Sequence, residues 1–328
     1  MFKKLIIFIS AFFTLTFFSF SASSEEYVMV GFYNEHPVFI PDHHFFHEHG
    51  KKLGVKTRVV GPPDGNVPQM ITALEQVIAS KPAGIILLGV NESLNVLVDE
   101  AMNQGIPVVT WDSDIPTSRR ITHVGTNWAQ LGDKLAEAAF KASGGKGKAA
   151  MVGLVGASHM EAAFANFRAW MEANAPDMEV LPVFDDEAVV AKAHSVTAAL
   201  IQKHPDVAVI AGFDGSSGGG ICPAVREAGK SGTIKVVMND ILPAHMECLK
   251  EGTAQYIVGQ KRHIFGPIAL QTLYDINHSG ISFTERDGEL GIFPAPDKVD
   301  TGFLVVTQDN FEDMDAMVKN LEKLKFNL

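Results

Sequence analysis

Short apolar runs alternate with amphipathic stretches along most of this chain. Residues 27–33 and 84–88 are almost entirely hydrophobic and have the length of buried strands. Between them, Met70, Leu74 and Val77 recur every three to four residues, which places them on one face of a helix. Apolar strands that alternate with amphipathic helices are typical of parallel sheets covered by helices on both faces. The first part of the chain is therefore predicted to be α/β.

The same alternation begins again after residue 125. Trp128, Leu131 and Leu135 form a new helical stripe. Further runs of strand length follow at residues 148–155, 180–184, 207–211, 234–238 and 256–258. Right-handed crossovers between parallel strands make such sheets doubly wound. We therefore predict two doubly wound parallel-sheet lobes, with a crossover near residues 125–128, and 328 residues are enough for both.

The first 24 residues do not fit this pattern. Lys3 and Lys4 precede an apolar run over residues 5–20, and small residues follow at 21–24. This order is typical of a secretory signal peptide, and the apolar run is short for a membrane span, which needs about 20 residues. We expect residues 1–24 to be cleaved and the mature protein to be exported to a bacterial periplasm.

Composition narrows the possible functions. The chain has 27 Lys+Arg against 38 Asp+Glu, a formal net charge of −11, which argues against a nucleic-acid partner. Its two cysteines, Cys222 and Cys248, are too few for a disulfide scaffold or a zinc site of the cysteine type. In an oxidising compartment they either pair or remain buried thiols, and spacing alone does not decide between these states.

Polar or aromatic residues follow many of the predicted strands. They occur at residues 34–36, 89–92, 111–114, 213–214, 239–240 and 260–263. Asp and Asn in such places are often helix caps or turn residues. However, ligands of open α/β sheets bind beyond the carboxyl ends of the strands. Six polar strand ends on two lobes favour one shared cleft over six separate caps.

Five stretches resemble the ribose-type periplasmic sugar-binding proteins of bacterial ABC importers. They are NEHPVF at residues 34–39, GIPVVTWDSD at 105–114, GTN at 125–127, HPDV at 204–207 and VVMND at 236–240. The resemblance covers nearly the whole mature chain, and the stretch at 105–114 is the most specific.

The resemblance implies a set of ligand-binding residues. Asp112 and Asp240 match ligand aspartates of the two lobes, and Gln260 matches a ligand glutamine beside the hinge. Phe39 matches an aromatic residue that stacks on the sugar. The remaining candidates on the same strand ends are Asn34, His36, Phe213, Asp214 and Asn239. Carboxylates and amides suit the hydroxyls of a sugar, and an aromatic plane suits its C–H face.

The chain also departs from the family pattern. Ser113 and the region of Ala163 stand where sugar binders commonly carry arginines. We therefore expect a cleft rich in carboxylate, suited to a neutral polyol, a modified sugar or an amine-bearing ligand, unless Lys261, Arg262 or Arg119 reaches into it.

The resemblance further implies a clamp in which the chain crosses between the lobes three times. The crossing strands are expected near residues 125–127, 260–262 and 294–298. The N-terminal lobe then comprises residues 25–126 and 262–294, and the C-terminal lobe residues 127–261 and 295–328. A C-terminal amphipathic helix is predicted over residues 309–328.

Two other motifs offer different functions. Residues 215–219 match G-x-S-x-G, so that Ser217 with Asp240 and His245 or His263 could form a hydrolase triad. His43 and His47 have the i, i+4 spacing of metal ligands on a helix. A glycine turn and a solvated helix face are the more ordinary explanations of these two motifs, so we expect neither a metal nor another cofactor.

The sequence thus predicts a binding protein and not an enzyme. We expect a monomer that closes around one small polar ligand, such as a monosaccharide, polyol or sugar derivative, and delivers it to an ABC permease. The alternative is a sensor whose closed form docks on a membrane receptor and reports a sugar-type or autoinducer-type signal.

Overall fold

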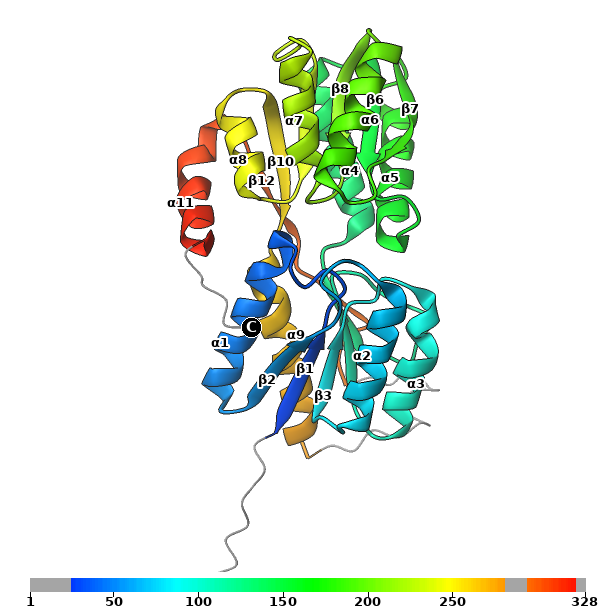
Figure 1. The fold of residues 1–328 in the computed structure, drawn as a ribbon, viewed down its shortest axis with the longest axis vertical. Helices are drawn as coiled ribbons and strands as arrows, with labels where there is room; N and C mark the ends of the chain where they lie inside the picture. Colours follow the sequence, from blue (N-terminus) through cyan, green and yellow to red (C-terminus); the bar gives the residue numbers. More distant parts are fainter. Residues whose placement is uncertain (1–24, 281–293, 323–328) are drawn as a thin grey trace, which may run out of the picture.

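A computed structural model describes residues 25–280 and 294–322 of the chain. These residues form two α/β lobes, one above the other, with the chain passing between them (Figure 1). The predicted signal peptide at residues 1–24 lies outside the described residues. No helix in the described ranges has the length and apolar character that a membrane span requires.

The first lobe is built on a parallel sheet in the order β11-β5-β4-β3-β1-β2. Its strands are β1 (Glu26–Val30), β2 (Lys56–Val60), β3 (Gly84–Leu87), β4 (Val108–Trp111), β5 (Thr122–Gly125) and β11 (Lys298–Asp300). Its helices are α1 (Ile40–Leu53), α2 (Val67–Ala79), α3 (Asn95–Asn103) and α9 (Phe265–His278). α1 packs with α9 and α2 with α3, so that both faces of the sheet are covered (Figure 1).

The second lobe repeats this plan in the order β12-β10-β9-β8-β6-β7. Its strands are β6 (Gly147–Gly153), β7 (Met178–Asp185), β8 (Val207–Gly212), β9 (Lys235–Asn239), β10 (Ala254–Gln260) and β12 (Phe303–Val306). Its helices are α4 (Trp128–Ser143), α5 (Ser158–Asn174), α6 (Val190–Lys203), α7 (Ser217–Glu227), α8 (Pro243–Lys250) and α11 (Phe311–Glu322). One departure from a fully parallel sheet is that β12 runs antiparallel to β10.

Alternation along the strands of the second lobe produces two separate cores. Val209 and Ala211 of β8 face one core with α4 and α5, whereas Ile210 faces the other core with α6, α7 and α8. Successive residues of a strand point to opposite faces, so a continuous apolar run serves both layers at once. The two predicted doubly wound lobes are confirmed.

The chain crosses between the lobes at three places. The first crossing joins β5 to α4, and the second leads from β10 through Lys261 into a short 3-10 helix, η3 (Arg262–Ile264). The third lies between β11 and β12, at residues 301–302. The boundary predicted after residue 294 comes too early, because β11 still pairs with β5 of the first sheet. Of the C-terminal helix predicted over 309–328, the structure describes α11, and residues 323–328 lie outside the described part.

The two cysteines are joined in a disulfide. Cys222 of α7 and Cys248 of α8 have Cα atoms 6.1 Å apart and close a loop with a sequence separation of 26 residues. Both are buried in the core that α7 and α8 share. The structure therefore decides the question of pairing that spacing leaves open.

The disulfide is expected to stabilise the second lobe. Closing a loop of this length removes entropy from the unfolded chain, so replacing both cysteines by alanine should lower the free energy of unfolding by about 3 kcal/mol. Urea unfolding of oxidised wild type, reduced wild type and the double variant tests this. Reductant should not affect the variant, and equal stability of all three samples would contradict the prediction.

Candidate functional site

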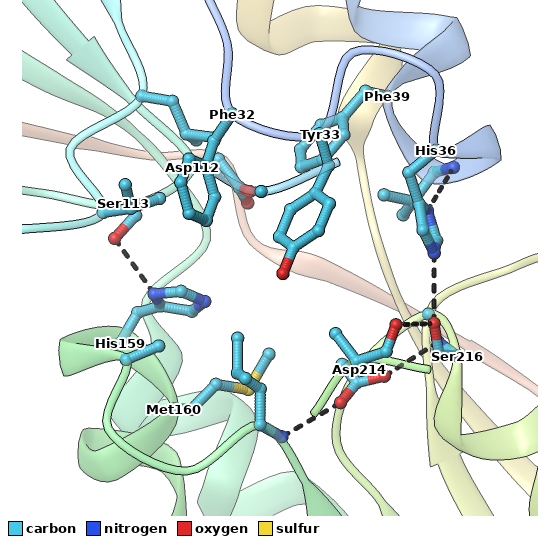
Figure 2. Close-up of a pocket in the computed structure, with 18 of the residues that line it drawn as sticks. Phe32, Tyr33, His36, Phe39, Asp112, Ser113, His159, Met160, Asp214 and Ser216 are labelled. Carbon is cyan, nitrogen blue, oxygen red and sulfur yellow. Dashed lines mark hydrogen bonds between the residues drawn. The ribbon is translucent and has the colours of Figure 1, made fainter. Parts of the chain in front are cut away.

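A cavity of about 330 Å³ lies between the lobes and collects most of the predicted ligand residues. Six of the nine candidates line it: His36, Phe39, Asp112, Asp214, Asp240 and Gln260. Figure 2 labels the first four of these. The size falls in the range of small-ligand sites. First-lobe strand ends and second-lobe loops meet here because the carboxyl edges of both sheets face the cleft.

Backbone geometry directs the two central aspartates into the cavity. Asp112 directly follows β4 and Asp240 directly follows β9, and both have left-handed φ values, 60° and 65°. A residue other than glycine adopts this conformation at an energetic cost, and such strain is concentrated at functional sites. Gln260 Nε2 donates a hydrogen bond to Asp240 Oδ1 at 3.0 Å. Burial raises the pKa of Asp240 to about 6.

Arg262 provides the guanidinium that the sequence pattern seemed to lack. It opens η3, directly after the second crossing, and lines the cavity although only 7% of it is exposed. Its Nη1 donates to Asp112 Oδ1 at 3.1 Å and its Nε donates to Asp42 Oδ2 at 2.7 Å. Its guanidinium lies 4.7 Å from the ring centre of Phe39, a cation–π contact. The exception stated for the carboxylate-rich cleft therefore applies, because the guanidinium of Arg262 reaches into the cavity and pairs with Asp112.

Aromatic side chains form the upper side of the cavity in Figure 2. Phe32 and Tyr33 pack edge to face with ring centres 4.8 Å apart, and both line the cavity. The strand predicted over residues 27–33 ends at Val30, so these two side chains belong to the following loop. The hydrophobic run over residues 27–33 did not indicate where the strand ends, because an apolar strand and an aromatic loop have the same hydrophobic pattern.

Among the hydrogen bonds that connect the lobes, two between a histidine and a serine lie on opposite sides of the cavity (Figure 2). The Nε2 of His36 lies 3.2 Å from Ser216 Oγ, and the Nδ1 of His159 lies 2.9 Å from Ser113 Oγ. His36 Nδ1 accepts from the backbone of Val38, so its Nε2 carries the proton. The hydroxyl of Ser113 donates to the Gly89 carbonyl, so the proton of the second pair is on His159 Nδ1. Burial lowers the pKa of both histidines to about 4, which keeps the rings neutral near pH 7.

Asp214 lines the cavity but is largely occupied by its own lobe. Its carboxyl oxygens accept the backbone N–H groups of Leu154, Ser216 and Ser217 at 2.8–3.0 Å. Burial, reinforced by the neighbouring carboxylate of Asp186, raises the pKa of Asp214 to about 8. Its main structural role is therefore to hold the turn that enters α7.

The G-x-S-x-G motif forms that same turn and the first residues of α7. Ser217 is fully buried and donates to Asp186 Oδ2 at 2.7 Å, with no hydrogen bond to a histidine among the described residues. It is also absent from the cavity lining. The arrangement does not support a nucleophilic serine.

Three of the candidates do not reach the cavity lining. Phe213 packs in the core of the second lobe, with ring centres 4.8 Å from Phe164. Asn239 is buried and donates to the Phe213 carbonyl at 3.0 Å. Asn34 packs over Gly31, where an added Cβ would come within 1.9 Å of its Oδ1. Phe213 and Asn239 each directly precede an aspartate that lines the cavity, and successive side chains of a strand point to opposite faces. The presence of polar residues at a strand end does not show which of them faces the ligand.

Contacts within the first lobe hold both histidines of the α1 pair, and the expected solvated helix face is wrong for His43, which is buried. His47 Nδ1 is 2.7 Å from Thr57 Oγ1, and the ring of His43 stacks on Phe39. Across residues 25–280 and 294–322, no three His, Cys, Asp or Glu side chains are grouped as metal ligands would be.

Comparisons of the sequence and of the fold with known proteins all find binding proteins. A family model described as a periplasmic binding protein domain matches residues 27–278. A D-ribose/D-allose-binding protein of Pseudomonas aeruginosa is 26% identical over 241 residues, 72% of this chain and 67% of that protein. Among solved structures, an arabinose binding protein from Geobacillus stearothermophilus is 28% identical with a TM-score of 0.77, covering 89% of this chain and 99% of its own. An ABC transporter solute binding protein from Burkholderia graminis, in complex with D-arabinose, is 26% identical with a TM-score of 0.78. The match covers 87% of this chain and 95% of that protein. These relatives are binding proteins, which confirms the prediction that the chain is not an enzyme.

Loss of Arg262 is expected to destabilise the protein strongly. Arg262→Met leaves the carboxyl groups of Asp42 and Asp112 buried without their cation, which should cost about 3–5 kcal/mol of unfolding free energy. Combining it with Asp42→Asn should recover part of this loss, because one of the unpaired carboxyl groups is removed. Chemical unfolding of the two single variants and the double variant measures the coupling. Additive losses would contradict the pairing.

The neutral state of His159 predicts an acid-sensitive stability. Its pKa is about 4 in the folded protein against about 6.5 in the unfolded chain, so below pH 6.5 the unfolded chain binds the extra proton. Above pH 6.5 His159 is neutral in both states and does not reduce the unfolding free energy. As the pH falls from 6.5 towards 4, its protonation in the unfolded chain lowers the unfolding free energy progressively.

His159→Gln should therefore reduce the pH dependence of the unfolding free energy between pH 6.5 and 4.5, by up to about 1.4 kcal/mol per pH unit. Urea unfolding over this range tests it. The difference between the two proteins at pH 8 serves as the baseline for lost packing. An unchanged slope would show that His159 takes up its proton equally well in the folded state.

Proposed function

The chain belongs to the periplasmic binding protein family, and on this premise we propose that it captures a monosaccharide, polyol or sugar derivative between its lobes and delivers it to an ABC permease. The observation that carries the proposal is the buried polar group at the base of the cavity, formed by Asp112, Arg262, Asp240 and Gln260. The relatives reported above, one named for ribose and allose and two for arabinose, support a sugar-like ligand.

Hydrogen-bonding capacity remains at the base of the cavity. Arg262 Nη2 and Gln260 Oε1 are buried and have no hydrogen-bond partner among the described residues. Buried polar atoms are normally satisfied, so a donor and an acceptor left open in a ligand cavity favour a ligand that carries hydroxyl groups. A sugar hydroxyl both accepts and donates, and the adjacent carboxylate of Asp112 accepts a charge-assisted bond.

Aromatic rings complement these polar contacts. Phe32, Tyr33 and Phe39 of the first lobe and Trp128 of the second all line the cavity. Ring faces pack well on the C–H faces of a pyranose or furanose, whereas the hydroxyls project outward to polar groups. The combination fits a neutral ring ligand, because Arg262 is already paired with two carboxylates and does not offer a free positive charge to an anion.

Closure of the lobes would trap the ligand. The bonds His36–Ser216 and Ser113–His159 each join one lobe to the other, so they form only when the lobes approach. The three crossings are the covalent links between the lobes, and they would serve as the hinge. The closed form then presents both lobes to a membrane partner.

Ligand binding provides the first test. A panel of D-ribose, D-allose, D-arabinose and related polyols should raise the melting temperature of the purified protein. Asp112→Asn and Asp240→Asn should weaken the affinity for the best ligand by about tenfold or more, because each removes a charged acceptor at the base of the cavity. The exposed Asp177→Asn is the matched control. Equal affinities in all four proteins would contradict this site.

Delivery to a permease has its own readout. In the source cell, deletion of the gene should abolish high-affinity uptake of the radiolabelled ligand, and the wild-type gene should restore it. Intact uptake with loss of a ligand-dependent transcriptional response would contradict delivery and support the sensor alternative.

A further inference from the structure

The cavity changes in character from its base to its mouth. Asp112, Asp240, Gln260 and Arg262 at the base are each only 4–7% exposed. Val155, which also lines the cavity, is 45% exposed and therefore lies at the opening. The polar groups at the base are thus buried deeply, and an apolar side chain stands at the entrance.

The apolar part extends over both lobes. Phe32, Val67 and Val90 line the cavity from the first lobe, and Leu154, Val155 and Met160 line it from the second. None of these side chains can donate a hydrogen bond, and only the weak thioether acceptor of Met160 can receive one. In the view of Figure 2, Met160 and Asp112 lie at opposite edges of the cavity.

Three polar side chains that line the cavity beside this apolar region already have partners in the protein. The Ser113 hydroxyl donates to the Gly89 carbonyl, and the Ser216 hydroxyl donates to the Ala188 carbonyl. The carboxyl oxygens of Asp214 accept three backbone N–H groups. A ligand hydroxyl placed against the apolar side chains would lose its water and find few replacement partners besides the Tyr33 hydroxyl and the Nε2 of His159, which is unfavourable.

We propose that the ligand is a sugar or polyol that carries an apolar group, either a methyl group in place of a hydroxymethyl or hydroxyl, or an O-alkyl substituent. Its hydroxyls bind Asp112, Arg262, Asp240 and Gln260 at the base, and its apolar group contacts Leu154, Val155 and Met160 on the second-lobe side of the cavity. This inference rests on the proposed function, since it specifies which member of the sugar class the cavity selects.

Matched ligand pairs test the proposal by calorimetry. The pairs are L-fucose with L-galactose, L-rhamnose with L-mannose, and methyl glycosides with the corresponding free sugars of the first panel. In pairs with measurable binding, the deoxy or O-methyl member should bind about tenfold tighter or more, since one methyl group in an apolar pocket discriminates by at least this factor. Equal or tighter binding of the hydroxylated member in every such pair would overturn the inference and leave sugar capture intact. No binding by any member of either panel would overturn the proposed function itself, and the inference with it.

A pair of variants locates the source of the preference. Met160→Gln introduces a donor and an acceptor into the apolar region, so it should reduce the preference for the deoxy or methylated member to about threefold or less. Met160→Leu preserves the apolar character and should keep the preference, whatever it does to the affinity itself. Melting temperatures of the unliganded variants verify folding. A preference that survives Met160→Gln unchanged would overturn the role assigned to this region.

Discussion

The ion pairs of Arg262 are the interaction on which the rest of the site depends. This residue follows the second crossing directly, and its guanidinium binds Asp42 of α1 and Asp112 at the end of β4. It thereby fixes the start of the returning segment against the first lobe. A buried guanidinium with two carboxylates is stable only if its geometry and hydrogen bonds are well satisfied. The aromatic ring of Phe39 over its face contributes to this.

The same contacts define what remains for a ligand. Asp42 binds Arg262 on the side away from the cavity lining, and Asp112 lies on the side that faces it. The unpartnered Nη2 of Arg262 and Oε1 of Gln260 lie at the base, whereas Asp214 spends most of its hydrogen-bonding capacity on backbone groups. A carboxylate that lines a cavity is therefore not automatically a ligand residue, because its role depends on how many of its lone pairs the protein has already used.

The cleft contains two aspartates with strained backbones and two histidines that are held neutral. The left-handed backbones of Asp112 and Asp240 direct both carboxyl groups into the space between the lobes. On both sides of that space, His36 and His159 are held neutral by burial, and each bonds to a serine of the opposite lobe. The residues that join the lobes also line the cavity, so closure of the lobes and occupation of the cavity are coupled.

The sequence by itself determined the architecture and the centre of the site. Periodicity predicted two doubly wound lobes, since strands of parallel sheets must be apolar on both faces and helices on one, and this pattern is local. Strand ends and the family resemblance identified Asp112, Asp240, Gln260 and Phe39, because the carboxyl edge of an open sheet is where its loops converge.

Only the tertiary structure decided which side chains share the cavity. It selected Arg262 from the three basic residues that could reach the cleft, added His159 from the other lobe, and turned Phe213 and Asn239 into the core. It also paired the two cysteines and extended the first sheet with β11. These outcomes depend on contacts between residues distant in sequence and on the direction of single side chains, and neither is encoded in a local pattern of hydrophobic and polar positions.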